Sequence, residues 1–230
     1  MIRKISLSLL AVLAMAIPAK SQEFFDTSDA SKFFTFGARI GFNTSNRTFA
    51  KDAFNQYSND SWGTGFDLGV LANLNFKEYL SIQPGLFYES RSGNYAYASE
   101  YEDRYNPLDV QTVLGHWRSY YFTIPVMGVV KYQFSDNLKI SAEFGPYVQF
   151  QWKESGKGIE YFEFLPLEGQ YTHYLAEQNK VDFGFKMGFG FQFYDHYYLG
   201  VHYLAGVCHA YSRPSGGHNK SWTFSIGYDF

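Results

Sequence analysis

Long apolar runs are missing from this chain, and cysteine and charge are scarce. Beyond residue 17 no stretch approaches the roughly 18 consecutive apolar residues that indicate a membrane helix, which excludes a helical inner-membrane protein. The single cysteine, Cys208, excludes an internal disulfide. Charged residues make up only 18% of the chain and the formal net charge is −3, so no basic face predicts nucleic-acid binding.

Aromatic residues are abundant. They form 21% of the 230 residues, with 20 Tyr and 24 Phe, yet the mean hydropathy is a mildly polar −0.28. Many aromatics without long apolar runs are typical of strands in which apolar and polar side chains alternate.

The N-terminus predicts export. Arg3 and Lys4 precede a short apolar run at 5–17, and a small-residue site ends at Ser21. This pattern indicates a cleaved signal peptide over 1–21, because the run is shorter than the roughly 20 residues that a membrane anchor needs. We expect a short periplasmic lead over 22–32 and a single barrel domain over 33–230. The residue directly after the expected cleavage site is Gln22 and not the cysteine that would carry a lipid anchor.

The last segment of the chain alternates strictly between large apolar and small or polar residues. Its apolar members are Trp222, Phe224, Ile226, Tyr228 and Phe230. Period two indicates a strand with one apolar face. A membrane barrel closes such a strand against its first strand and turns the aromatics to lipid. We also expect this strand to be the signal that the barrel-assembly machinery recognises.

Seven earlier segments show the same alternation. The eight predicted strands cover 34–43, 64–76, 80–89, 120–134, 138–153, 181–193, 197–207 and 222–230. One face of each carries no charge, as expected where Arg or Lys facing mid-bilayer costs about 2–4 kcal/mol. A soluble, lipocalin-like barrel would need charged outer faces, which neither parity provides. The sequence therefore predicts an all-β fold, an eight-stranded antiparallel up-and-down transmembrane β-barrel.

The predicted connections alternate in length, as in outer-membrane barrels. Tight turns lie at 77–78, 135–137 and 194–196, and long loops are predicted near 44–62, 90–118, 154–180 and 208–219. Aromatic and acidic residues in the 90–118 segment suggest a protein or glycan partner. They are Tyr95, Tyr97, Tyr101, Tyr105, Trp117, Glu100, Glu102, Asp103 and Asp109.

The inward faces carry charges of both signs. The predicted network consists of Arg39, Asp67, Glu89, Lys131, Lys139, Glu143, Lys153, Asp182, Lys186 and Asp229. An eight-stranded barrel is just wide enough for its own side chains, and a buried charge without a partner is costly. We therefore expect a structural plug of ion pairs, with a proton or ion path as the alternative.

Catalytic and metal chemistry have weak support. His202, Ser225 and Asp182 share the predicted interior, but no Gly-x-Ser-x-Gly motif surrounds Ser225. Cys208, His209 and His218 provide three candidate ligands where a structural zinc site needs four. We expect no enzyme activity, no cofactor and no metal. A lipid or peptide hydrolase and a narrow pore remain the alternatives.

Several motifs resemble the PorT-like outer-membrane β-barrel proteins of Gram-negative bacteria. The matching segments are Leu80-Ser-Ile-Gln-Pro-Gly-Leu-Phe-Tyr88, Tyr121-Phe-Thr-Ile-Pro-Val126, Phe144-Gly-Pro-Tyr147, Val181-Asp-Phe-Gly-Phe185 and Tyr198-Leu-Gly-Val-His-Tyr203. The resemblance implies an outer-membrane barrel with a structural or interaction role. One branch of the family serves protein secretion, but no residue here matches that role. The expected partners are outer-membrane lipid, the assembly machinery and a binder at the long loops.

Overall fold

The computed structural model describes residues 25–48, 57–58, 61–103, 106–162, 179–208 and 218–230. The signal peptide predicted for 1–21 lies outside these residues, as does most of the loop predicted at 154–180. Among the described residues, no helix is long and apolar enough to cross a membrane.

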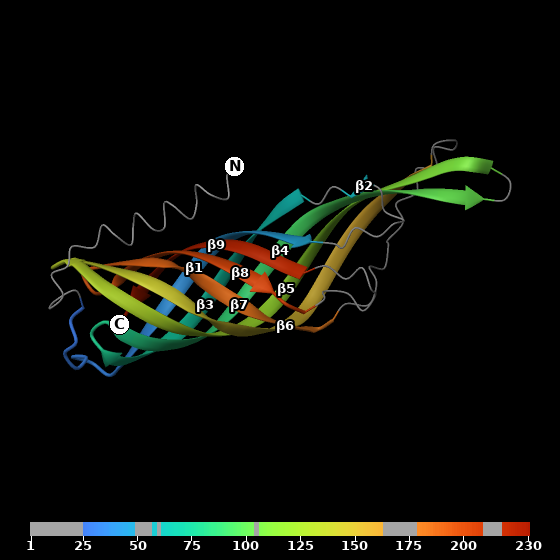
Figure 1. Ribbon diagram of the computed structural model, residues 1–230. Helices are drawn as coiled ribbons and strands as arrows, with labels where there is room; N and C mark the ends of the chain where they lie inside the picture. Colours follow the sequence, from blue (N-terminus) through green and yellow to red (C-terminus); the bar gives the residue numbers. More distant parts are fainter. Residues whose placement is uncertain (1–24, 49–56, 59–60, 104–105, 163–178, 209–217) are drawn as a thin grey trace.

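Eight long strands form a closed antiparallel barrel (Figure 1). Each strand pairs with its neighbours in the chain, and the ring closes where β1 pairs with β9. A two-residue strand, β2, adds to the outer part of β4. The strands are β1 Phe34–Thr48, β2 Tyr57–Ser58, β3 Ser61–Lys77, β4 Leu80–Asp103, β5 Asn106–Ser135, β6 Leu138–Phe162, β7 Val181–Phe193, β8 Tyr197–Gly206 and β9 His218–Asp229.

Apolar side chains cover the outside of the barrel. Val70, Ile226 and Phe189 are 59%, 57% and 62% exposed, whereas their strand neighbours Gly69, Ser225 and Gly190 are screened from solvent. Exposure alternates residue by residue along β7 and β9. Because this surface is apolar and uncharged, its natural solvent is hydrocarbon. The predicted parity of the eight segments is therefore confirmed along most of their length.

Short turns join the strands at one end of the barrel, here called the turn end. They connect β3 to β4, β5 to β6 and β7 to β8. In the third turn, Tyr194 and Asp195 have φ angles of 52° and 61°. Positive φ at adjacent turn residues matches the right-handed twist of the flanking strands. The three predicted tight turns are confirmed to within one residue, at 78–79, 136–137 and 194–196.

The opposite end, here called the loop end, differs from prediction. β4, β5 and β6 continue beyond the barrel wall as a projecting sheet, visible on the right of Figure 1. Pairing of β4 with β5 extends to Asp103↔Asn106, and pairing of β5 with β6 extends to Gln111↔Phe162. The loop predicted at 90–118 is thus mostly a β-hairpin. Apolar alternation is absent there because outside a membrane neither face of a strand needs to be apolar.

The lead before β1 is attached to the turn end. Phe25 packs against Tyr79 with ring centroids 5.5 Å apart, and the Lys77 ammonium lies 2.6 Å from the Asp29 carboxylate. The hydrogen bond and the positive charge of Lys77 hold the pKa of Asp29 below its ordinary value. The backbone N–H of Ser31 donates to the Glu78 carboxylate at 2.7 Å. These contacts place the lead over the rim of the barrel.

Candidate functional site

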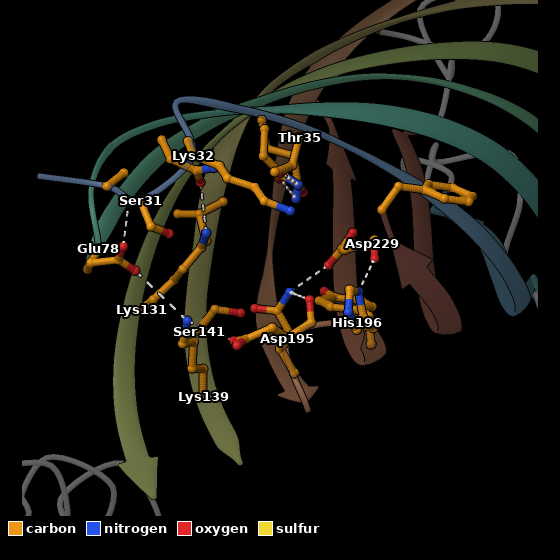
Figure 2. A pocket seen from close by; sticks show the side chains of 18 of the residues that line it. Ser31, Lys32, Thr35, Glu78, Lys131, Lys139, Ser141, Asp195, His196 and Asp229 are labelled. Carbon is orange, nitrogen blue, oxygen red and sulfur yellow. Dashed lines mark hydrogen bonds and ion pairs between the residues drawn. The ribbon is translucent and has the colours of Figure 1, made fainter. Parts of the chain in front are cut away.

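A polar cavity of about 290 Å³ lies inside the turn end; we call it the vestibule. It is bounded by the lead, the turns and inward side chains of all eight long strands (Figure 2). The charged residues that line it are Lys32, Arg39, Lys77, Lys131, Lys139, Glu78, Glu143, Asp195 and Asp229. Both signs of charge therefore meet in one cavity.

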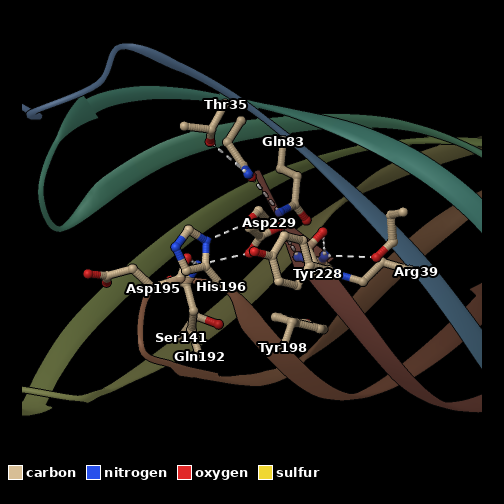
Figure 3. A network of polar contacts seen from close by, with 12 residues as sticks. Thr35, Arg39, Gln83, Ser141, Gln192, Asp195, His196, Tyr198, Tyr228 and Asp229 are labelled. Atoms are coloured by element: carbon tan, nitrogen blue, oxygen red, sulfur yellow. Dashed lines mark hydrogen bonds and ion pairs between the residues drawn. The ribbon is translucent and has the colours of Figure 1, made fainter.

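Arg39 and Asp229 form the inner boundary of the vestibule (Figure 3). Their side chains are 2.7 Å apart and almost fully buried. Gln192 donates to the second carboxylate oxygen of Asp229 at 2.8 Å, and the Arg39 guanidinium lies 3.9 Å from the centre of the Tyr198 ring. This pairing joins β1 to β9 at the closure of the barrel, and cross-strand neutralisation reduces the cost of burying both charges.

Glu143 is the most heavily hydrogen-bonded carboxylate of the described interior. Ser141 and Tyr198 each donate a hydroxyl to one of its oxygens at 2.8 Å. The other oxygen lies 2.8 Å from Nε2 of His202. The cluster links β6 to β8 across the lumen and closes the inner side of the vestibule.

A second set of charges fills the middle of the barrel. Glu89 and Arg91 pair on the inward face of β4, and the Lys186 ammonium lies 4.7 Å from the centre of the Phe87 ring. Asp67 is buried nearby, beside a cavity of only about 20 Å³, which has room for roughly one water molecule. The interior of the described barrel is thus filled by side chains at this level.

Arg47 closes the loop end. Its guanidinium contacts Glu154 at 2.9 Å, Tyr121 Oη at 2.8 Å and the face of Trp117 at 3.8 Å. Further hydrogen bonds run to Ser119 Oγ and Asn219 Oδ1. Asn219 in turn donates to the carboxylate of Asp182 at 2.9 Å. Asp182, one of the predicted lumen charges, therefore has a hydrogen-bond donor in the interior.

Two predicted positions are wrong. Lys153 is exposed rather than inward, because the pairing shifts from Tyr120↔Lys153 to Tyr121↔Gln151 and leaves Trp152 as an extra residue. This bulge inverts the parity of the strand, so that Glu154 takes the inward position. Trp117, predicted to be exposed in a loop, is 1% exposed.

Three important inward charges were missed in the sequence, namely Arg47, Arg91 and Glu154. All lie in segments predicted to be loops, but the structure extends the strands through them. An available signal was the i, i+2 spacing that places Arg91 on the same face as Glu89.

Lys131 and Lys139 lie near the turn end, where Lys139 contacts the exposed carboxylate of Asp195 at 2.8 Å.

The structure gives His202 different partners from those of the hydrolase hypothesis. Its described hydrogen bonds go to Glu143 and Tyr198, while Asp182 binds Asn219 on the loop side. His218 contacts the backbone oxygen of Cys208 at 3.2 Å, and His209 lies outside the described residues. Within the described ranges, no group of three His, Cys, Asp or Glu side chains is arranged to hold a metal ion.

The side chains predicted for the assembly signal all face outward. Trp222, Phe224, Ile226 and Tyr228 lie on β9, and Phe230 follows it with 66% exposure. The backbone N–H of Phe230 donates to the carbonyl of Phe36 at 2.8 Å. This outward apolar row continues the outer surface of β1.

Comparisons with known proteins agree with this architecture. A family model described as outer membrane protein beta-barrel domain matches residues 21–211. No curated relative matches the sequence.

Solved structures similar to this chain share little of its sequence. Ail, the attachment invasion locus protein of Yersinia pestis, was solved in complex with the heparin analogue sucrose octasulfate. It is 14% identical, with 86% of this chain and 100% of that chain covered and a TM-score of 0.41. OprG from Pseudomonas aeruginosa is 11% identical, with coverage of 90% and 99% and a TM-score of 0.41. The outer membrane protease OmpT of Escherichia coli is 11% identical, with coverage of 85% and 96% and a TM-score of 0.42.

Proposed function

Since the chain belongs to the outer membrane protein beta-barrel domain family, we propose that its barrel is an anchor for the projecting sheet, which binds a protein partner at the cell surface. The single observation that carries this proposal is the extension of β4, β5 and β6 beyond the barrel wall (Figure 1). Outer-membrane barrels have short turns on the periplasmic side and long connections outside. By that rule the projecting sheet is extracellular.

Strand addition is the mode of binding that this geometry favours. β7 pairs with β6 only as far as Val181↔Phe150, whereas β5 accompanies β6 to Phe162. The outer part of β6 therefore has one edge without a strand partner among the described residues. An exposed edge presents unpaired N–H and C=O groups to an incoming strand, and side chains add specificity.

The filled lumen supports an anchoring role over a pore. Ion pairs of Arg39, Arg91 and Arg47 fill the lumen at the turn end, in the middle and at the loop end, and the Arg47–Glu154 pair spans it from β1 to β6. We propose that the protein conducts no ions and catalyses no reaction. In support of the second statement, the described hydrogen bonds of His202 run to Glu143 and Tyr198, and none joins it to Ser225, the candidate nucleophile.

Export and assembly complete the proposal. A signal peptide over 1–21 would be cleaved during secretion, and the barrel-assembly machinery would recognise β9 and Phe230. Within the family, the motifs at 80–88 and 121–126 favour the PorT-like group, and we extend the proposal to membership of a secretion or surface complex in a Gram-negative envelope.

A hairpin deletion tests the proposal. Replacing 95–115 by Asn-Gly shortens β4 and β5 at Asn94↔His116, above the Arg47 cluster, and should leave the barrel folded. Photo-crosslinkers placed at Ile159 in the edge of β6 should capture a specific protein in intact outer membranes. Capture by the crosslinker at Ile159 should be lost when residues 95–115 are deleted. It should be retained in the control variant Lys153→Ala, which carries the same crosslinker and the complete hairpin. Equal capture with and without the hairpin would refute the proposal.

A further inference from the structure

The vestibule contains an ammonium group that lacks an anionic partner. Lys131 is half-buried, and its Nζ donates to the neutral amide oxygen of Asn75 at 2.9 Å. No described carboxylate lies within 4 Å of it. Burying a charge against a neutral acceptor alone is unfavourable compared with burying it beside an anion.

Three of the neighbouring cations are already paired. Arg39 binds Asp229, Lys77 binds Asp29, and Lys139 binds Asp195 with Glu78 further away at 3.9 Å. Lys139 also repels the Lys131 ammonium. Lys131 therefore differs from Arg39, Lys77 and Lys139, the other cations that the strands contribute to the cavity.

The nearby carboxylates are occupied by closer donors. Asp229, Glu78 and Glu143 attract Lys131 only at long range. Asp229 already accepts from Arg39 and Gln192, and Glu143 accepts from three side chains. Glu78 accepts from the backbone N–H of Ser31. None of the three is free to move to Lys131 without losing a shorter contact.

A second lysine lies beside the same amide. Asn75 donates through Nδ2 to the backbone oxygen of Lys32 at 3.0 Å, while its Oδ1 accepts from Lys131. Lys32 lines the vestibule, and no described carboxylate lies within 4 Å of its ammonium. Asn75 thus links the Lys131 ammonium to the backbone of Lys32, and both lysines lie on the side of the cavity opposite Asp229 and His196 (Figure 2).

We propose that the vestibule binds a small oxyanion ligand, carrying a carboxylate or a phosphate, between Lys131 and Lys32. An oxyanion accepts charge-assisted hydrogen bonds from both ammonium groups and supplies the missing counter-charge. The volume of about 290 Å³ is at the lower limit of roughly 300–1,000 Å³ for small-molecule sites. The ligand is therefore a small molecule or a single terminal group, and it enters from the turn end.

The site is independent of the projecting sheet, which lies at the opposite end of the barrel. By the orientation rule for outer-membrane barrels, the turn end faces the periplasm. The ligand would therefore be a periplasmic solute, and its binding would survive deletion of the hairpin.

Calorimetric titration of the refolded barrel in detergent tests the inference. Inorganic phosphate and succinate are the two probes, and they distinguish a phosphate ligand from a carboxylate ligand. We expect saturable binding of at least one probe that weakens as sodium chloride is raised, because screening reduces attraction between exposed charges. Lys131→Met should weaken it at least tenfold, and Lys131→Arg should retain it. Lys153→Met, which removes an exposed lysine outside the vestibule, should bind as the wild type does.

Folding must be checked in each variant by its heat-dependent mobility on a gel. If Lys131→Met fails to fold, Lys32→Met provides the same test, because Lys32 is an exposed residue of the lead. Absence of saturable binding by both probes would overturn the inference. It would also be overturned if the folded Met variants bound as tightly as the wild type.

Discussion

Replacing Glu143 by alanine should destabilise the folded barrel strongly without opening it. Glu143 accepts three hydrogen bonds, from Ser141, Tyr198 and His202, and its side chain is only 2% exposed. Hydrogen bonds to a charged group contribute about 1.5–3 kcal/mol each, so the three together are worth roughly 4.5–9 kcal/mol. Removal of the carboxylate also removes its own desolvation cost of several kcal/mol. The expected net loss is the roughly 3–5 kcal/mol typical of breaking a buried pair.

Glu143→Gln separates the hydrogen bonds from the charge. The amide oxygen can still accept from Tyr198 and Ser141, so we expect a smaller loss of about 1–2 kcal/mol. Asp136→Ala is the matched control, because it removes an exposed carboxylate from the turn between β5 and β6. This change should leave the stability unaltered.

The assay is reversible urea unfolding of each variant in lipid vesicles, followed by tryptophan fluorescence. Conductance across a planar bilayer is measured on the same preparations and should stay at the level of the bare membrane. If Glu143→Ala and Asp136→Ala unfold at the same urea concentration, the hydrogen-bonded cluster does not stabilise the lumen. Conductance in the wild-type protein would refute the plug itself.

Three further predictions concern the outer surface, the end of the chain and the lead. Val70→Arg should cost about 2–4 kcal/mol in vesicle unfolding, because residue 70 points outward in mid-strand; an unchanged midpoint would mean that this face does not meet lipid. Deleting Phe230 should leave the protein unfolded in the periplasm, and normal levels in the outer-membrane fraction would contradict this. The Asp29–Lys77 contact should be pH-dependent. Since the pKa of Asp29 is lowered in the folded state, its stabilising effect is complete above the unfolded pKa and disappears as pH falls through the folded one. Proteolysis of the lead should therefore quicken in acid, and Asp29→Asn should remove that pH dependence.

Strand parity could be predicted from the sequence wherever the barrel meets hydrocarbon. There the hydrocarbon requires an apolar residue at every second position, as Phe189 and Ile226 illustrate. The alternation in the sequence therefore identifies the face of each strand that points outward. Beyond the apolar band this constraint ends, so β4, β5 and β6 carry no periodic signal over their outer parts. Their length is set by inter-strand hydrogen bonds, which leave little trace in residue type.

The interior could be predicted only in part for the same reason. Arg39, Glu143 and Asp229 lie within the alternating segments, and their inward positions followed from parity. Arg47 and Arg91 lie past the last clear alternation, and Lys153 was misplaced by a one-residue bulge that no composition signal marks. Which charges pair depends on strand register and shear, which parity alone does not specify.

The pairing of β1 with β9 leaves the cylinder without a seam. Residues Gly37 to Thr48 match His218 to Asp229 in the same antiparallel manner as any other adjacent pair of strands, and the last backbone N–H reaches back to Phe36. In the closed barrel, no strand is topologically first or last. A circularly permuted chain, with its ends joined across this junction and new ends at Asp136 and Asn137, would therefore refold in vitro to the same barrel.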